Sequence, residues 1–394
     1  MAATNYHTSV AGRWQDARAR SSFLHRFMDS LTQALYGATV QGALLGRRQG
    51  RRSLVYGAIL GTLPDLDVII RYADPVSSMT FHRGFSHSVF VLTVFSIVLA
   101  WLIRRWRPSP DYSGARLAFT IWAVLITHVL LDAFTAYGTQ LFWPFSPTPT
   151  SWSNLFIVDP VFTVPLLAAV AASGLTRRQP MPTRGLWLAL AFTTLYLAFT
   201  FFSQSVVEDR VRETYEVRGI PVERVQIGSA PFNSVLWRYV VDDGRGHYYE
   251  GFASLFDPVK PGMLREAVAS GTIGATTPAP DPRFERGLAL RDAFSRDVGD
   301  HALHDRLRWF TGDWLRYDEI EGVLVVTDLR MGLAGRHFFR FVIGERDADG
   351  HWRALTPRNW PGLRGGADEL KLVLQRAWDS GVRLPLADWE RDMR

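Results

Sequence analysis

Three short clusters of aspartate and histidine interrupt the most hydrophobic part of this 394-residue chain. They are Pro64-Asp65-Leu66-Asp67, His82-Arg83-Gly84-Phe85-Ser86-His87 and His128-Val129-Leu130-Leu131-Asp132. Ionisable side chains inside or beside membrane-length helices are costly unless they bind something. Imidazole nitrogens and carboxylate oxygens are common metal ligands. The three clusters therefore predict one metal site within a helical membrane domain.

Six apolar runs occupy the first half of the chain, each close to the roughly 20 residues that a spanning helix needs. They cover residues 31–46, 53–72, 86–103, 116–134, 157–174 and 185–202. The first run is short and glycine-rich, which leaves an interfacial helix as an alternative. Gly42 and Gly46 in the first run, and Gly57 and Gly61 in the second, have the spacing that lets two helices pack closely. We therefore expect about five to six transmembrane helices, with the first two as a tight pair.

The remainder of the chain reads as a soluble α+β domain over residues 205–394, after a helical membrane domain over 28–204 and a leader over 1–27. The leader carries arginines but no apolar segment, which argues against a cleaved secretory signal and leaves Met1 or Met28 as the start. In the C-terminal part, a hairpin is predicted from 235–241 and 247–255, further strands from 323–326 and 338–343, and helices from 301–316 and 367–380. His301 and His304 are interpreted as a solvated pair on a helix surface.

Arginines gather in the segments that join the apolar runs, at residues 47–52, 104–107 and 177–184. Positively charged loops stay in the cytoplasm, so the other loops and the C-terminal domain are expected on the opposite, extracytoplasmic side of the membrane. The formal charge of +6 then reflects topology, and no nucleic-acid partner is expected. The chain has no cysteine, so a transition-metal site must use histidine and carboxylate ligands.

This topology brings the three clusters to one membrane face. His128 and Asp132 are one helical turn apart and share a helix face. Asp65 and Asp67 would point about 200° apart on a regular helix, so either Pro64 breaks the helix or the two carboxylates have different roles. Ser86 is expected to cap the third helix, with His82 in the preceding loop and His87 in the first helical turn.

Residues outside the three clusters are weaker candidates. Some are expected near the same level of the membrane, and others are expected to form an interfacial aromatic belt more readily than a substrate wall. The first group is Asp29, Thr32, Gln33 and Asp159, and the second is Tyr137, Gln140, Trp143 and Phe145.

Longer sequence blocks carry a resemblance to a known family. These blocks are Met28-Asp29-Ser30-Leu31-Thr32-Gln33, PDLD from residue 64, HRGFSHS from residue 82 and HVLLDAFTAYGTQLFWPFS from residue 128. Together they resemble the YdjM-type membrane-bound metal-dependent hydrolases, also described as LexA-regulated inner-membrane proteins, most strongly over residues 28–165. That family is in turn distantly similar to zinc-dependent phospholipase C and to zinc nucleases, which implies hydrolysis at a metal held by histidine and aspartate.

The functional hypothesis is a membrane-embedded metal-dependent hydrolase that uses metal-activated water. The metal ligands are expected among Asp65, Asp67, His82, His87, His128 and Asp132. A non-ligating Asp65 or Asp67 would act as general base, and Arg83 would neutralise a phosphate. Zinc is the expected divalent ion, with manganese or iron as alternatives. Membrane lipids are the expected partners, with a phospholipid or another phosphoester as substrate.

A second hypothesis retains a bound metal but no hydrolytic activity. Intramembrane carboxylates also mark ion pathways. The chain would then be a non-catalytic membrane protein, or an ion- or proton-coupled transporter, with a structural or transported metal.

Overall fold

The computed structural model describes residues 31–156, 158–258, 282–333, 335–361 and 365–391. The expected leader over 1–27, together with Met28 and Asp29, lies outside these residues. The chain folds into two compact units. Of the described residues, the first unit contains 31–65, 95–128 and 160–191, and the second contains 66–94, 129–159 and 192–391.

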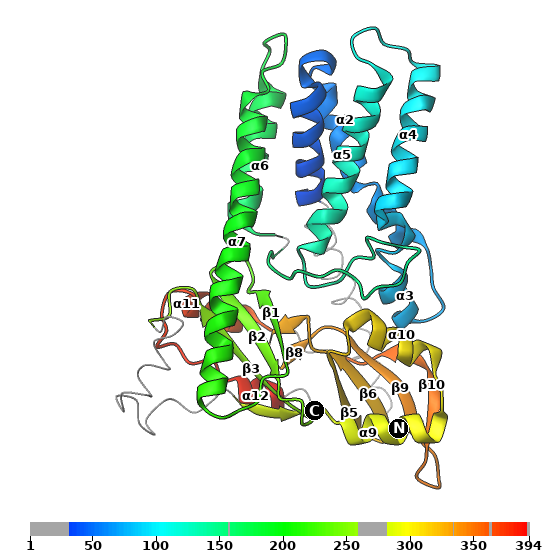
Figure 1. Ribbon diagram of the computed structural model, residues 1–394, viewed down its shortest axis with the longest axis vertical. Helices are drawn as coiled ribbons and strands as arrows, with labels where there is room; N and C mark the ends of the chain where they lie inside the picture. The colour runs from blue at the N-terminus through cyan, green and yellow to red at the C-terminus, as the bar shows by residue number, and fades with distance from the viewer. Residues whose placement is uncertain (1–30, 157, 259–281, 334, 362–364, 392–394) are drawn as a thin grey trace, which may run out of the picture. The chain divides into compact units, whose positions relative to one another are not determined.

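Three helices in the described part of the chain are long and apolar enough to cross a membrane. They are α4 (Val89–Trp106), α5 (Gly114–Ala133) and α7 (Arg184–Val217) (Figure 1). The apolar helix α6 (Pro160–Leu175) is shorter, and a further helix covers residues 31–49. Three of the six predicted runs thus form helices of spanning length, and α7 continues for 34 residues, past the end of its apolar run.

The second apolar run is not one continuous helix. Helix α2 (Arg52–Thr62) ends just before Pro64, which begins the 3-10 helix η1 (Pro64–Ile69). Proline lacks an amide hydrogen and disfavours helical geometry at the residue before it. The break considered at Pro64 is therefore confirmed, and both aspartates of the first cluster lie beyond it.

The helix over residues 31–49 and α2 pack with their backbones in close approach. A Cβ atom added at Gly57 would lie 2.3 Å from the carbonyl oxygen of Gly37, and one added at Gly61 would lie 2.7 Å from that of Gln33. The expected tight pair is confirmed. On the first helix, however, Gly37 makes the close backbone approach, whereas Gly42 and Gly46 face side chains.

The second unit contains two four-stranded antiparallel sheets and a two-stranded one. The first sheet has the order β1 (Arg224–Ser229), β2 (Leu236–Asp242), β3 (His247–Ser254) and β4 (Arg283–Glu285). The second has the order β10 (Trp352–Asn359), β9 (Arg340–Arg346), β6 (Val323–Asp328) and β5 (Leu315–Ile320), and the small sheet pairs β7 (Gly332–Leu333) with β8 (Arg336–His337). The predicted hairpin is confirmed, since β2 pairs with β3 from Leu236 opposite Ser254 to Asp242 opposite Tyr248.

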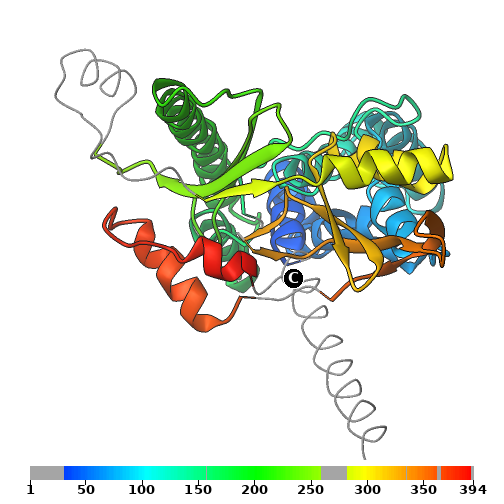
Figure 2. The same ribbon diagram turned by 90° about the horizontal axis from the view of Figure 1, so that it is seen from below.

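Helices cover both large sheets. The C-terminal end of α7 buries Val207, Val211 and Tyr215 against the first sheet, and α11 (Ala367–Arg376) and α12 (Leu386–Arg391) also pack beside that sheet (Figure 2). Helices α9 (Leu288–Val298) and α10 (Ala302–Thr311) pack on the second sheet (Figure 1). The predicted helix over 301–316 is too long, because Gly312 takes a left-handed conformation at the end of α10 and β5 begins at Leu315.

A short helix from the loop between the second and third apolar runs belongs to the same core. Helix α3 (Pro75–Phe81) starts with Asp74, whose carboxylate accepts the amide of Ser77 at 2.8 Å, and with proline at the first helical position. Val76 and Met79 of this helix are buried with residues of α9, α10 and the second sheet. The segment directly before His82 is thus packed into the C-terminal part of the chain.

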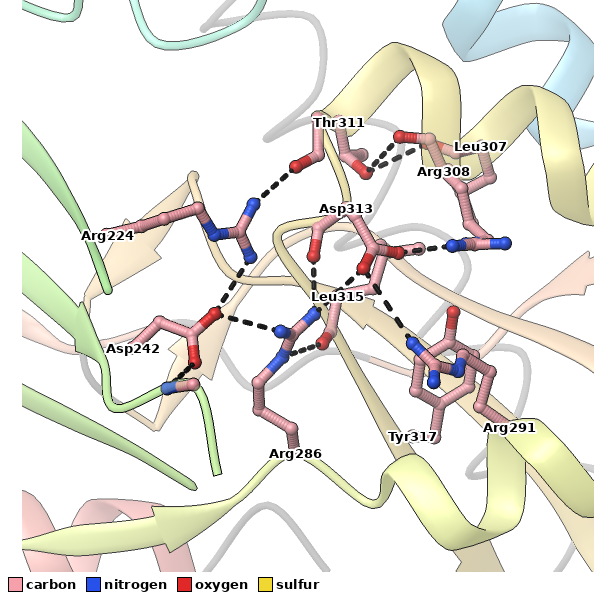
Figure 3. A network of polar contacts seen from close by, with 12 residues as sticks. Arg224, Asp242, Arg286, Arg291, Leu307, Arg308, Thr311, Asp313, Leu315 and Tyr317 are labelled. Atoms are coloured by element: carbon pink, nitrogen blue, oxygen red, sulfur yellow. Dashed lines mark hydrogen bonds and ion pairs between the residues drawn. The ribbon is translucent and has the colours of Figure 1, made fainter. Parts of the chain in front are cut away.

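An arginine and aspartate network joins the two large sheets (Figure 3). Asp242, at the end of β2, accepts hydrogen bonds from Arg224 at 2.8 Å and from Arg286 at 2.9 Å. Arg286 also donates to the carbonyl oxygens of Asp313 and Leu315, at the start of the second sheet. Asp242 and Arg286 are buried, so this network fixes one sheet against the other.

Candidate metal centre

The six predicted ligands lie on four segments. Asp65 and Asp67 are in η1, and His82 follows the end of α3. His87 ends the 3-10 helix η2 (Phe85–His87), and both His128 and Asp132 are on α5. The expectation that Ser86 caps the third helix and that His87 lies in its first turn is wrong. Helix α4 begins at Val89, and the hydroxyl of Ser88 accepts the amide of Val91 at 3.4 Å.

Asp67 organises the loop that carries the second cluster. Its carboxylate lies 2.8 Å from His82 Nδ1, and it accepts hydrogen bonds from the Arg83 amide at 3.1 Å and from the Ser86 hydroxyl at 2.7 Å. Asp67 therefore serves as an acceptor for three groups of one loop.

His87 is fully buried between two carboxylates. Its Nε2 lies 3.0 Å from Asp132 Oδ2, and its Nδ1 lies 2.9 Å from the Ser86 hydroxyl and 3.7 Å from Asp67. The two ring nitrogens thus have different partners, and the one near Ser86 and Asp67 sets the orientation of the ring.

Arg83 lies against the other oxygen of Asp132. Its guanidinium is 3.1 Å from Asp132 Oδ1 and donates to the Thr135 hydroxyl at 3.2 Å, with its centre 5.0 Å from the ring centroid of Tyr137. Arg83 also has a positive φ of 58°, a conformation that is rare for residues other than glycine. This buried cation neutralises part of the carboxylate charge beside His87.

His128 has the same division between its two ring nitrogens. Its Nδ1 lies 2.6 Å from the carbonyl oxygen of Gly61, and its Nε2 lies 3.5 Å from Asp65 Oδ1. A carbonyl only accepts hydrogen bonds, so Nδ1 carries a proton, and Nε2 is the ring nitrogen that faces Asp65. Gly61 takes part through its backbone, which no sequence motif for metal ligands would reveal.

Four of the predicted ligands come together. Asp65, His87, His128 and Asp132 each offer one ligand atom, and these atoms all lie within 4.8 Å of one another. Asp67 and His82 stand outside this group of four and hydrogen-bond each other. His87, His128 and Asp132 are buried, whereas the side chains of Asp65 and His82 are 21% and 26% exposed.

The weaker candidates have other neighbours. Asp159 is buried and accepts hydrogen bonds from Tyr196 at 2.6 Å and Ser234 at 3.1 Å. Thr32 pairs with Thr163, and Tyr137 donates to the carbonyl of Met79. Trp143 and Phe145 are exposed, as an aromatic belt requires.

The interpretation of His301 and His304 as a solvated pair is wrong. His304 is buried with its Nε2 2.9 Å from the Tyr317 hydroxyl, and His301 accepts the amide of His304 at the start of α10. The fold of the second sheet over α10 covers His304, and the local sequence gives no sign of that packing.

Apolar helices of spanning length, together with a buried group of two histidines and two aspartates, define a membrane protein with a candidate metal centre. Residues 28–207 match the YdjM inner membrane protein family, which confirms the resemblance drawn from the sequence for that part of the chain. YfhP of Bacillus subtilis (strain 168), an uncharacterized protein, is 28% identical over 153 residues, which are 36% of this chain and 46% of that protein. The inner membrane protein YbcI of Escherichia coli (strain K12) is 32% identical over 98 residues, which are 24% of this chain and 55% of that protein.

The chain thus spans about half the length of these relatives. No solved structure matches the chain.

Proposed function

We propose that Asp65, His87, His128 and Asp132 bind one divalent metal ion and that the chain is a membrane-embedded, metal-dependent hydrolase. The observation that carries the metal site is the shared arrangement of its two histidines. Each turns Nε2 toward a carboxylate of the group while Nδ1 meets a different partner, Gly61 for His128 and Ser86 with Asp67 for His87. Metal-binding histidines have this arrangement because the second partner fixes the tautomer and the ring orientation.

The types of donor atom and the distances between them also fit a bound transition-metal ion. Two imidazoles and two carboxylates suit zinc, with manganese or iron as alternatives. Bonds of about 2.0–2.2 Å in a tetrahedral site place neighbouring ligand atoms roughly 3.3–3.6 Å apart. The distance of 3.5 Å from His128 to Asp65 lies in that range, and the distance of 3.0 Å from His87 to Asp132 is slightly shorter.

The proposed reaction is hydrolysis of a phosphoester, with a membrane phospholipid as the favoured substrate. A bound ion would lower the pKa of water and polarise the phosphoryl oxygen. Asp67 orients His82, which would accept the proton of the attacking water. Arg83 supplies positive charge beside Asp132, where a phosphate oxygen would gather negative charge.

The proposed topology is a multi-pass protein of the bacterial inner membrane. Besides α4, α5 and α7, we propose that α6, the helix over residues 31–49 and the shorter α2 cross the bilayer, which gives six spans, within the expected five to six, and keeps the arginine-rich segments on one side. The exposed parts of Asp65 and His82 would face the extracytoplasmic side, together with the C-terminal sheets. Apolar side chains that are exposed on α4, among them Phe90, Val94 and Trp101, support contact with lipid.

Elemental analysis of the purified full chain tests the metal site. We expect about one transition-metal ion per chain in the wild type, an unchanged amount in His351→Ala, whose histidine has a side chain 70% exposed, and loss of the ion in His128→Ala. Equal metal content in His128→Ala and in the wild type would refute the site.

Turnover separates the hydrolase from the non-catalytic hypothesis. Metal-loaded wild type should hydrolyse a phosphodiester or phospholipid, and Asp132→Asn should not, at preserved folding. Bound metal without any turnover on these substrates would favour a structural or transported ion. Turnover that persists in Asp132→Asn would place the chemistry elsewhere.

A further inference from the structure

A cavity in the first unit is lined by residues that the proposed metal site does not use. It has a volume of about 450 Å³ and lies where the end of the helix over residues 31–49 meets the starts of α5 and α7. Its lining includes Leu44, Arg47, Arg48, Arg116, Thr183 and Trp187. Three of these six side chains carry a permanent positive charge.

The surrounding segments offer little negative charge to balance these arginines. Residues 31–65, 95–128 and 160–191 contain eleven arginines but only two acidic residues, Asp65 and Asp111. Among the described residues, no carboxylate forms an ion pair with Arg47, Arg48 or Arg116. The cavity therefore presents cationic groups whose natural counterion is an anion from outside the chain.

The position of Arg116 is fixed. One of its terminal nitrogens donates to the carbonyl of Leu44 at 2.9 Å, near the C-terminal end of the first helix. A guanidinium has five N–H donors, so this hydrogen bond anchors Arg116 and leaves donors for a second acceptor. A planar guanidinium can donate two parallel hydrogen bonds to two oxygens of a phosphate, which a monatomic anion cannot accept.

The remaining lining residues indicate where the anion comes from. Trp187 is 49% exposed and Leu44 is partly exposed, so apolar surface borders the charged groups. Tryptophan and arginine together at the ends of apolar helices are typical of the headgroup level of a membrane. Basic pockets between membrane helices on the cytoplasmic side bind anionic lipid headgroups.

We propose that this cavity binds the phosphate group of an anionic phospholipid through Arg47, Arg48 and Arg116, with Trp187 and Leu44 along the lipid chain. This site is separate from the Asp and His cluster, and its existence does not depend on hydrolysis there. A free phosphate shares the same chemistry, and the experiment distinguishes the two sources.

The test measures binding of phosphatidylglycerol to the full chain in detergent by native mass spectrometry, with phosphatidylcholine as the neutral lipid. The variant R47Q/R48Q/R116Q removes the three cavity charges. The variant R105Q/R107Q/R177Q removes three charges from exposed arginines that do not line the cavity. We expect phosphatidylglycerol affinity to fall about tenfold or more in the cavity variant and less than about twofold in the control.

A second experiment adds inorganic phosphate or glycerol 1-phosphate as a competitor of bound phosphatidylglycerol. If neither soluble anion displaces the lipid, the site recognises a lipid headgroup. If both displace it as well as added phosphatidylglycerol does, the same arginines bind free phosphate. An equal loss of phosphatidylglycerol affinity in both triple variants overturns the proposal. So does a wild-type protein that binds phosphatidylglycerol no better than phosphatidylcholine and does not bind phosphate. If the triple variant does not fold, R47Q/R48Q carries the test, because neither side chain forms a hydrogen bond or an ion pair with the described residues.

Discussion

At the scale of single residues, the candidate centre separates groups that face the proposed ion from groups that hold those residues in place. Asp132 and His87 belong to the first kind, and Asp67 belongs to the second because its oxygens serve His82, Arg83 and Ser86. The sequence alone could not divide these roles, since Asp65 and Asp67 are only two residues apart. The 3-10 geometry after Pro64 gives the two carboxylates different neighbours.

Asp67→Asn should weaken metal binding without abolishing it. The amide keeps the size of the side chain but loses the negative charge that orients His82 and the loop to His87, so affinity should fall about 10–100-fold. Competition against a chelator measures this change. Asp74→Asn is the matched control, because asparagine still caps α3, and it should leave affinity unchanged. Unchanged affinity in Asp67→Asn would contradict the supporting role.

His304 should make the protein less stable in acid. Burial and the charge of Arg308 lower the pKa of His304 from 6.5 to about 4. Below pH 6.5 the unfolded chain takes up a proton that the folded chain accepts only near pH 4, so stability is full above pH 6.5 and falls as the pH drops toward 4, by roughly 3 kcal/mol in all.

Thermal unfolding between pH 7.5 and 4.5 checks this expectation. His304→Gln should flatten the pH dependence relative to the wild type, while His351→Gln, which alters an exposed histidine, should not. Parallel curves for wild type and His304→Gln would show that another group is responsible.

At the scale of elements, close packing of the first two helices also supports the centre. Gly57→Ala would place a methyl group 2.3 Å from the Gly37 carbonyl, which should destabilise the protein by about 1–3 kcal/mol. Displacement of α2 would also move the Gly61 carbonyl that fixes His128, so metal content should fall. Gly185→Ala, whose Cβ would meet nothing within 4 Å, should change neither melting temperature nor metal content. Two equally stable variants would refute the close approach.

The network between the two large sheets makes a separate prediction. Asp242→Asn removes the nearer of the two carboxylates that pair with the buried guanidinium of Arg286 and leaves Asp313, at 3.4 Å, as its charged partner, at an expected cost of up to about 3–5 kcal/mol. Glu319→Gln removes a more exposed ion pair with Arg346 and should cost less than about 1 kcal/mol. Denaturant unfolding of both variants compares these costs, and similar values would mean that the network adds no stability.

The elements that the sequence predicts correctly are those with a strong local signal. Residues 114–133 form a helix because they are predominantly apolar over 20 residues, and the β2 to β3 hairpin follows from the turn Asp242-Asp243-Gly244-Arg245-Gly246. Helix α3 was not predicted, because its stability comes from burial of Val76 and Met79 among residues more than 200 positions away. In the centre, ligand types were visible in the sequence, whereas the contribution of the Gly61 carbonyl depends on packing between helices.

At the scale of the whole molecule, the membrane orientation can be read directly, because the chain has no cysteine and any introduced one is unique. Asp349→Cys, in the exposed turn before β10, should react with an impermeant maleimide in intact spheroplasts. Ser113→Cys, in the exposed segment before α5, should react only after permeabilisation. The reverse pattern would invert the proposed topology.

The burial of Val76 and Met79 with α9, α10 and the second sheet has a consequence for biosynthesis. Helix α3 emerges from the ribosome early, but its packing partners are translated about 200 residues later. The loop that bears His82 and Arg83 therefore lacks its support while the first helices are inserting. At the proposed site, an ion would then be held in its final geometry only after translation is nearly complete, and a prematurely terminated chain would reach the membrane without this support.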